Sequence, residues 1–260
     1  MIRCHTVPEF YLKYFLASAS KCFWVYDKKD LSAREQTPIN TTVIKDYYIS
    51  EPDNKGGKNT QIEEFLSIIE GMTKPIFDKW LKKPTNINMN DITIAALFLA
   101  FAYTRVPRTV EVVKEIVNVG VEKVIETMKI DAENQEGLRK QYEGFLKSHH
   151  GKDIHVSFEE FSELMADPTK YCSFKINEKH AVGRSLELVG GVHKLLMNMH
   201  WGIRYIKGDH FFITSDAPLN VFVPTDDDRA IFGGGLAQPA VQVAFPLSPK
   251  VCLLIMQKKY

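Results

Sequence analysis

Hydrophobic residues recur at helical spacing through the middle of the chain. Thr60 is a capping residue before a helix that should extend to about Leu81, and Asn88 opens an apolar helix that should end near Arg105. Pro107 fits the first turn of the next helix, because proline has no N–H to lose there. Further helices are expected at about 132–148, after Ser157, and over 177–199. The pattern therefore predicts a helical section from about residue 60 to about residue 200.

Short runs rich in β-branched and aromatic residues occupy both ends of the chain. Those that predict strands are 22–27, 41–50, 201–206, 210–214, 220–223, 241–245 and 251–256. A short helix should precede them, with Thr6 and Glu9 spaced as a capping box. We therefore expect an α+β fold in a single domain, residues 1–260. In it, the strands of 1–59 and 200–260 join in one antiparallel or mixed sheet, and the helical section is an insertion of about 60–200.

The composition is that of a globular protein without a strong electrostatic field. The 260 residues are 45% hydrophobic and 25% charged, which is enough to bury a sizeable core. With 33 basic and 32 acidic residues the formal charge is +1, so no global field attracts nucleic acid or a membrane, although a local basic groove is compatible with this balance. The longest apolar run, Ile92 to Tyr103, is shorter than the roughly 20 residues that span a bilayer.

The N-terminus and the cysteines favour a cytoplasmic location. The first residues lack the apolar segment of a signal peptide. No two of the four cysteines are spaced as a metal-binding or redox pair; they are Cys4, Cys22, Cys172 and Cys252. We expect reduced thiols and no membrane association, and the sequence leaves the oligomeric state open.

His5 and Asp216 are the first candidates for a functional site. His5 precedes the predicted first helix, whose dipole would favour a neutral imidazole suited to act as a base or metal ligand. Asp216 follows the predicted strand that ends at Thr214, and could bind a metal, orient a histidine or accept a proton. Both have structural alternatives. His5 could orient the helix through the backbone, and Ser215-Asp216 before Pro218 is also turn chemistry.

Arg105 is the third candidate, because it closes the apolar helix. It would either complement the helix dipole or anchor a phosphate or carboxylate. Glu63, Glu64 and Glu70 lie on one predicted helix, and Glu63 and Glu70 share a face. We interpret Glu63 as the capping partner of Thr60, and Glu64 and Glu70 as solvated side chains. This interpretation is favoured over a pair of catalytic or metal-binding carboxylates.

Two histidines downstream have the spacing of one helix face. His193 and His200 lie seven residues apart on the predicted helix 177–199 and its end, but no third ligand accompanies them. Core or surface histidines are favoured over a metal site at this position.

Three segments together resemble a known protein family. They are His5-x-Val7-Pro8-x-x-Tyr11-Leu12-x-x-Phe15, Ile213-Thr214-Ser215-Asp216-x-Pro218 and Phe245-Pro246-Leu247-Ser248. In this order they resemble the prokaryotic family of unknown function numbered 4238, and weaker matches at Ile62-Glu63, at Arg105 with Pro107 and at Trp201 extend the similarity over nearly the whole chain. The resemblance carries no activity. The family places an amide three residues before the arginine, where this chain has Ala102.

The candidate residues lead to two functional hypotheses. The first is a metal-assisted hydrolase of phosphodiester bonds in RNA or DNA, an activity that a toxin or defence effector would use. His5 would serve as base or ligand, Asp216 as ligand and Arg105 as phosphate anchor, with a divalent metal ion held by His5, Asp216 or Glu64. The alternative is a non-catalytic module that binds a partner or a phosphate-containing ligand, in which the signature residues are scaffold.

Overall fold

The computed structural model describes residues 1–49, 59–82, 87–132, 134–149, 155–168, 176–224 and 235–257. Cys172 lies outside these residues. The chain forms two compact units: one comprises 1–111 and 179–260, and the other comprises 112–178.

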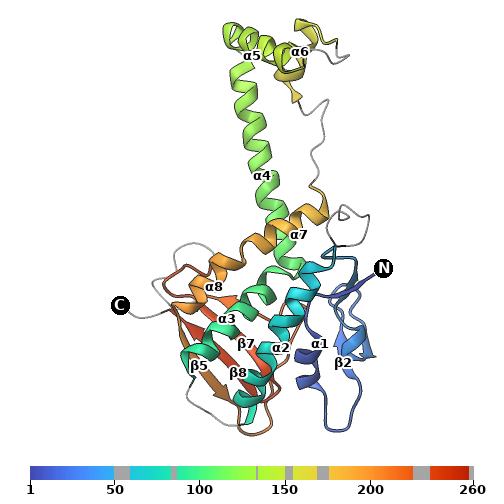
Figure 1. Ribbon diagram of the computed structural model, residues 1–260, viewed down its shortest axis with the longest axis vertical. Helices are drawn as coiled ribbons and strands as arrows, with labels where there is room; N and C mark the ends of the chain where they lie inside the picture. Colours follow the sequence, from blue (N-terminus) through green and yellow to red (C-terminus); the bar gives the residue numbers. More distant parts are fainter. Residues whose placement is uncertain are drawn as a thin grey trace. The chain divides into compact units, whose positions relative to one another are not determined.

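A four-stranded antiparallel sheet forms the C-terminal part of the first unit. Its strands are β5 (His200–Tyr205), β6 (Asn220–Phe222), β7 (Gln242–Ser248) and β8 (Val251–Met256), in the order β5-β8-β7-β6. Along β7, residues alternate strictly between buried and half-buried, so one face is in the core and the other is open. The helices α2 (Gln61–Lys82) and α3 (Met89–Thr104) lie over this sheet, and α8 (Val189–Met197) packs against α3 (Figure 1).

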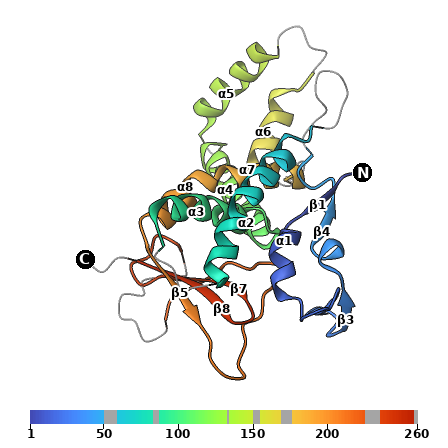
Figure 2. The same ribbon diagram turned by 60° about the horizontal axis from the view of Figure 1, so that its bottom comes forward.

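The N-terminal strands form two small sheets of their own. β1 (Arg3–His5) pairs with β4 (Val43–Lys45), and β2 (Phe23–Tyr26) pairs with β3 (Ala33–Gln36), both antiparallel. Between them along the chain lie the short helix α1 (Glu9–Leu12) and two 3-10 turns, η1 (Lys13–Phe15) and η2 (Pro38–Asn40). Figures 1 and 2 show α1 between these strands and the C-terminal sheet.

The predicted α+β class is confirmed, but the prediction of one shared sheet is wrong for the described residues. The N-terminal strands pair only among themselves, β2 with the next strand β3 and β1 with the more distant β4, and they are only three or four residues long. α1 stands between the two β parts, and they share no ladder of hydrogen bonds in the described residues. The predicted strand 210–214 is also absent. This segment forms isolated hydrogen bonds in place of a strand ladder. In one of them the Phe212 N–H donates to the Pro249 carbonyl oxygen at 2.8 Å.

Aromatic rings join the helical layer, the C-terminal sheet and α1 into one core. Phe245 of β7 is fully buried, and its ring centroid lies 4.8 Å from Tyr11, 6.0 Å from Phe77 and 6.2 Å from Phe98. Trp80, also fully buried, stacks on Phe77 at 5.8 Å. The core therefore depends on one strand side chain that contacts three helices.

The helices with strong caps begin where the sequence predicts. Asn88 accepts a hydrogen bond from the Asp91 backbone N–H at 2.9 Å, and α3 follows it. The capping box of Thr6 and Glu9 is wrong, because α1 begins at Glu9 after an uncapped Pro8. The Thr6 hydroxyl instead donates to the Thr42 carbonyl at 3.2 Å.

The predicted helix 177–199 consists of two helices. α7 (Glu178–Glu187) and α8 are separated by Leu188, and the Gly190-Gly191 pair, which weakens helical structure, lies in the first turn of α8. His200 starts β5, so the proposed helix face shared by His193 and His200 does not exist.

The second unit has a small hydrophobic cluster of its own. It contains the later part of α4 (Pro107–Ala132) with α5 (Gln135–Ser148) and α6 (Phe158–Ala166). The buried residues of the cluster are Leu138, Phe161 and Met165. The predicted cap of α6 is confirmed as a complete capping box of Ser157 and Glu160. Within the described residues, no helix is long and apolar enough to cross a membrane.

Candidate functional site

The imidazole of His5 hydrogen-bonds to the backbone of a neighbouring turn. Its Nε2 lies 3.2 Å from the Ile39 carbonyl oxygen, and Arg3 on the same face of β1 donates to that carbonyl at 2.7 Å. A carbonyl can only accept, so Nε2 is the donor in this bond, and in a neutral imidazole the lone pair is then on Nδ1. The predicted position at a helix N-terminus is wrong, because His5 ends a strand and α1 begins at Glu9.

Asp216 and Glu64 lie at the surface. The Asp216 carboxylate is exposed and hydrogen-bonds to no described residue, and the Ser215 hydroxyl beside it accepts from the Ala217 N–H at 3.2 Å, as in a turn. Glu64 accepts a hydrogen bond from the Thr60 hydroxyl at 2.6 Å. No hydrogen bond or ion pair joins His5, Arg105 and Asp216 to one another in the described part of the chain.

Tyr11 is the residue through which the three signature segments meet. Its buried hydroxyl donates to the Pro246 carbonyl at 2.8 Å and pairs with the Thr214 hydroxyl at 2.7 Å. Its ring packs on Phe245. The N-terminal signature therefore contacts both downstream segments through a side chain that braces the fold.

Tyr11→Phe is expected to lower the free energy of unfolding by about 1–3 kcal/mol, because the carbonyl of the half-buried Pro246 loses its donor. The matched control is Tyr26→Phe, since that side chain is 77% exposed and should change stability by less than about 0.5 kcal/mol. Urea unfolding of both variants measures the difference. Equal stabilities would show that Tyr11 does not brace the fold.

A buried polar cluster surrounds Arg105, the C-cap residue of α3. We call Cys4, Tyr48, Glu63, Glu70 and Arg105 the Arg105 cluster. Arg105 is 1% exposed, and its Nη1 donates to Glu70 Oε1 at 3.0 Å. The Glu70 side chain is 26% exposed, so the cluster reaches solvent on that side. A cation at a helix C-terminus also complements the helix dipole.

The guanidinium of Arg105 has one edge unused. Nε and Nη2 are buried and have no hydrogen-bond partner among the described residues. Oε1 of Glu63 is also buried and has no hydrogen-bond partner among these residues. Nε and Nη2 form the side edge of the guanidinium, which matches two oxygens of a carboxylate or phosphate. Buried donors without a partner are costly, so this edge is suited to an oxyanion.

Two members of the Arg105 cluster, Cys4 and Tyr48, are neutral at physiological pH. Burial, together with the Glu63 carboxylate, raises the pKa of the Cys4 thiol to about 11. Burial also raises the pKa of Tyr48, while Arg105 acts in the opposite direction and Glu63 and Cys4 add to the rise. The Tyr48 hydroxyl donates to the His5 carbonyl at 3.3 Å. The backbone of His5 thus borders the cluster, but its imidazole, on the opposite face of β1 from Cys4, does not.

Sequence reasoning missed the ion pair of Glu70 with Arg105 and the buried position of Glu63 Oε1. Their seven-residue spacing on one helix face was the available signal, but a cap and a solvated carboxylate explained it equally well. The structure places Glu70 against Arg105, and Thr60 pairs with Glu64 instead of Glu63. Cys4 and Tyr48 have no sequence motif around them and were found only through the fold.

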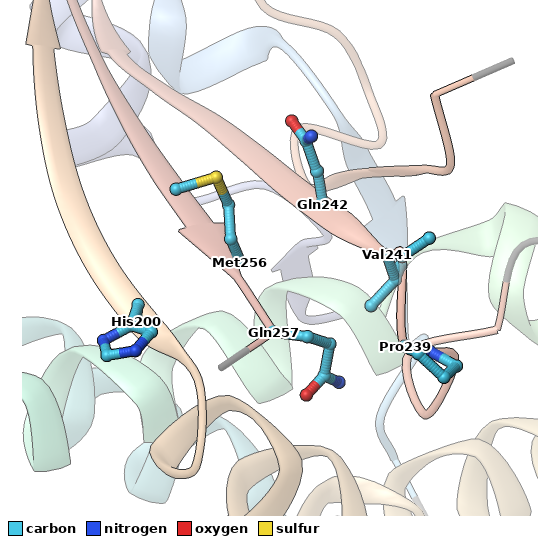
Figure 3. A pocket seen from close by; sticks show the side chains of 7 residues that line it. His200, Pro239, Val241, Gln242, Met256 and Gln257 are labelled. Carbon is cyan, nitrogen blue, oxygen red and sulfur yellow. The ribbon is translucent and has the colours of Figure 1, made fainter. Parts of the chain in front are cut away.

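A separate pocket of about 350 Å³ lies at the end of the C-terminal sheet (Figure 3). His200, Met256 and Gln242 line it from the neighbouring strands β5, β8 and β7, where they stand opposite one another. Of the described side chains that line this pocket, His200 alone is titratable. A polar ligand would find one imidazole and the amides of Gln242 and Gln257 there, without an acid–base pair.

The described residues include no group of three or more histidine, cysteine, aspartate or glutamate side chains that could hold a metal ion. The Arg105 cluster is the best-supported candidate site, and its chemistry is that of two buried hydrogen-bond donors without a partner among the described residues.

Comparison with known proteins agrees with the resemblance of the three signature segments. Neither the curated proteins nor the solved structures contain a match to this chain. One family model matches residues 3–259, nearly the whole chain. The chain belongs to the family described as "Protein of unknown function (DUF4238)".

Proposed function

We propose that the protein binds a phosphate-containing ligand and that Arg105 anchors it. The observation that carries this proposal is the free Nε–Nη2 edge of a guanidinium that is 1% exposed. Glu70 already holds Nη1 and fixes the plane of the group. A phosphate would accept both remaining N–H bonds side by side, which is the strongest geometry arginine offers.

The surroundings of Arg105 favour a small ligand or a terminal phosphate over a nucleic acid duplex. The anchor is buried, whereas duplex binding uses rows of exposed basic side chains. The net charge of +1 supplies no long-range attraction for a polyanion. The signature residues act as scaffold in this proposal, as the contacts of Tyr11 suggest.

Calorimetric titration of the full chain with inorganic phosphate tests this proposal. Arg105→Lys keeps the charge but loses the planar edge, and should weaken phosphate binding roughly tenfold or more. Arg108→Lys is the matched control, because Arg108 is exposed and lies one turn further along the chain. Absence of binding to the wild type, or equal binding by both variants, would refute the proposal.

Phosphodiester hydrolysis is the second candidate function. One observation favours it: the hydrogen bond to Ile39 leaves Nδ1 of His5 with the lone pair that a general base needs. Hydrolysis of an RNA or DNA oligonucleotide, measured beside the melting temperature, separates the two functions. Activity that His5→Gln and Asp216→Asn abolish without a change in melting would favour a hydrolase, and loss of stability without any activity would favour scaffold roles.

A further inference from the structure

We propose that the pocket at the end of the C-terminal sheet binds a free nucleoside through its base. Among the described residues this pocket shares no lining residue with the Arg105 cluster, so the site is independent of the proposed phosphate anchor. The ligand class is a small flat heterocycle whose edge carries a hydrogen-bond donor beside an acceptor.

Three of the lining residues form a row across neighbouring strands. His200 of β5 stands opposite Met256 of β8, and Met256 stands opposite Gln242 of β7. Residues paired in this way project from the same face of a sheet, and Figure 3 shows the side chains of Met256 and Gln242 next to each other. Because neighbouring strands lie about 4.8 Å apart, the backbones of His200 and Gln242 are about 10 Å apart, with Met256 between them. A flat ring on Met256 can therefore reach a polar group at each of two edges.

The apolar part of the lining favours an aromatic ring. Val241 and Ala240 are 1% and 4% exposed, and together with Pro239 they contribute apolar surface to the pocket. The Met256 side chain is half-buried, and a thioether makes favourable contacts with aromatic rings. An aromatic heterocycle gains from both kinds of contact.

The carboxamide of Gln242 provides the selectivity for a nucleobase. It presents an acceptor oxygen and a donor NH2 side by side. With this pattern glutamine pairs bidentately with the edge of a base, for example with N6 and N7 of adenine. No hydrogen bond joins the Gln242 amide or the His200 imidazole to a described residue, so within this part of the chain both are available to a ligand.

The second amide of the pocket is held in place by the backbone. Nε2 of Gln257 donates to the Leu236 carbonyl at 3.0 Å. This bond uses one N–H of the amide and fixes its orientation, so Gln257 is a preorganised part of the lining.

The lining and the size of the pocket favour an uncharged ligand of nucleoside size. None of the described lining residues is an aspartate, glutamate, lysine or arginine. A charged ligand would lose water in the pocket without gaining a counter-charge from these residues. The volume of about 350 Å³ lies at the lower end of the range for small-molecule sites.

The test is calorimetric titration of the full chain with two nucleosides, each beside an analogue that lacks the donor on the base. Adenosine is compared with purine riboside, and uridine with 3-methyluridine. The wild type should bind adenosine or uridine, and at least about fivefold more tightly than the matched analogue, because a bidentate pair is lost. Binding of neither nucleoside, or equal binding of nucleoside and analogue, would overturn the proposal.

Three variants assign the binding to this pocket. Gln242→Leu should weaken binding of the nucleoside at least about fivefold. Gln61→Leu is the matched control, because Gln61 is exposed at the start of α2 and does not line the pocket, and it should keep the wild-type affinity. Arg105→Lys should also keep it. A folded Gln242→Leu variant with wild-type affinity, or loss of nucleoside binding in Arg105→Lys, would place the site elsewhere.

A measurement on the side chain of Met256 decides the matter even if Gln242→Leu does not fold. The ¹³C–¹H signal of its methyl group is assigned by its absence in Met256→Leu. This signal should shift as the nucleoside is added and saturate with the dissociation constant from calorimetry. A signal that stays in place while the nucleoside binds would show that the base does not lie on Met256, and the proposal would fail.

Discussion

Phe245→Ala is expected to lower the free energy of unfolding by about 3–5 kcal/mol, the largest change in stability that we predict for one substitution. The ring is fully buried and contacts Tyr11, Phe77 and Phe98, which belong to three different helices. Its loss removes the apolar burial and leaves a cavity that rigid aromatic neighbours cannot fill. Chemical unfolding with a fluorescence or circular dichroism signal measures the change.

The matched control is Phe211→Ala, because Phe211 is 67% exposed in the segment between β5 and β6. This variant should differ from the wild type by less than about 0.5 kcal/mol. If Phe245→Ala is as mild as the control, the helices do not pack on the C-terminal sheet as described.

Arg105→Met is expected to abolish phosphate binding and to cost about 3 kcal/mol of stability. The substitution leaves Glu70 without its cation, and breaking a buried ion pair from one side is strongly destabilising. The cost falls at the lower end of the usual range because the Glu70 side chain is partly exposed and regains water. Unfolding curves and phosphate titrations of the same preparation measure both effects.

Glu70→Gln provides the comparison on the other side of this pair. The amide keeps an oxygen that accepts from Arg105, so we expect a cost of about 1 kcal/mol and phosphate binding that remains measurable. A larger loss for Glu70→Gln than for Arg105→Met would mean that Glu70, and not the buried guanidinium, is the centre of the cluster.

The helices were predictable because their signals are local. Asn88 and Ser157 cap helices through hydrogen bonds to residues three positions away. Both partners of each contact therefore lie within one four-residue segment of the sequence. The predicted capping box of Thr6 and Glu9 does not form, although the spacing of the two residues fits one. The Thr6 hydroxyl donates to the Thr42 carbonyl instead, and α1 begins only at Glu9. Local chemistry predicts a cap only where no distant group competes for it.

The strand pairing was less predictable because strands gain their partners from the whole chain. β3 has two adjacent charged residues, Arg34 and Glu35, and no apolar face, so it is not among the predicted strands. Each of the short N-terminal strands pairs with one other N-terminal strand in the described residues. The sequence therefore predicted most of the strands, but it missed β1 and β3 and did not predict how many sheets they form.

Part of the candidate site could be recognised from the sequence. Arg105 was a candidate because it ends an apolar helix, and the structure gives it a buried position with a free edge. His5 and Asp216 were chosen from their positions beside predicted elements, and neither element begins or ends where expected. Glu63 and Glu70 depend on the packing of α2 beside Arg105, a contact that spans 35 residues in the case of Glu70.

The measurement that tests the central claim most directly is the ¹⁵N–¹H nuclear magnetic resonance signal of the Arg105 Nε–H during titration with inorganic phosphate. The signal is assigned by its absence in Arg105→Lys. We predict that this signal shifts and saturates with the same dissociation constant that calorimetry gives for the wild type. A signal that stays in place while phosphate binds elsewhere, or while no phosphate binds at all, would contradict the assignment of Arg105 as the anchor of a phosphate-containing ligand.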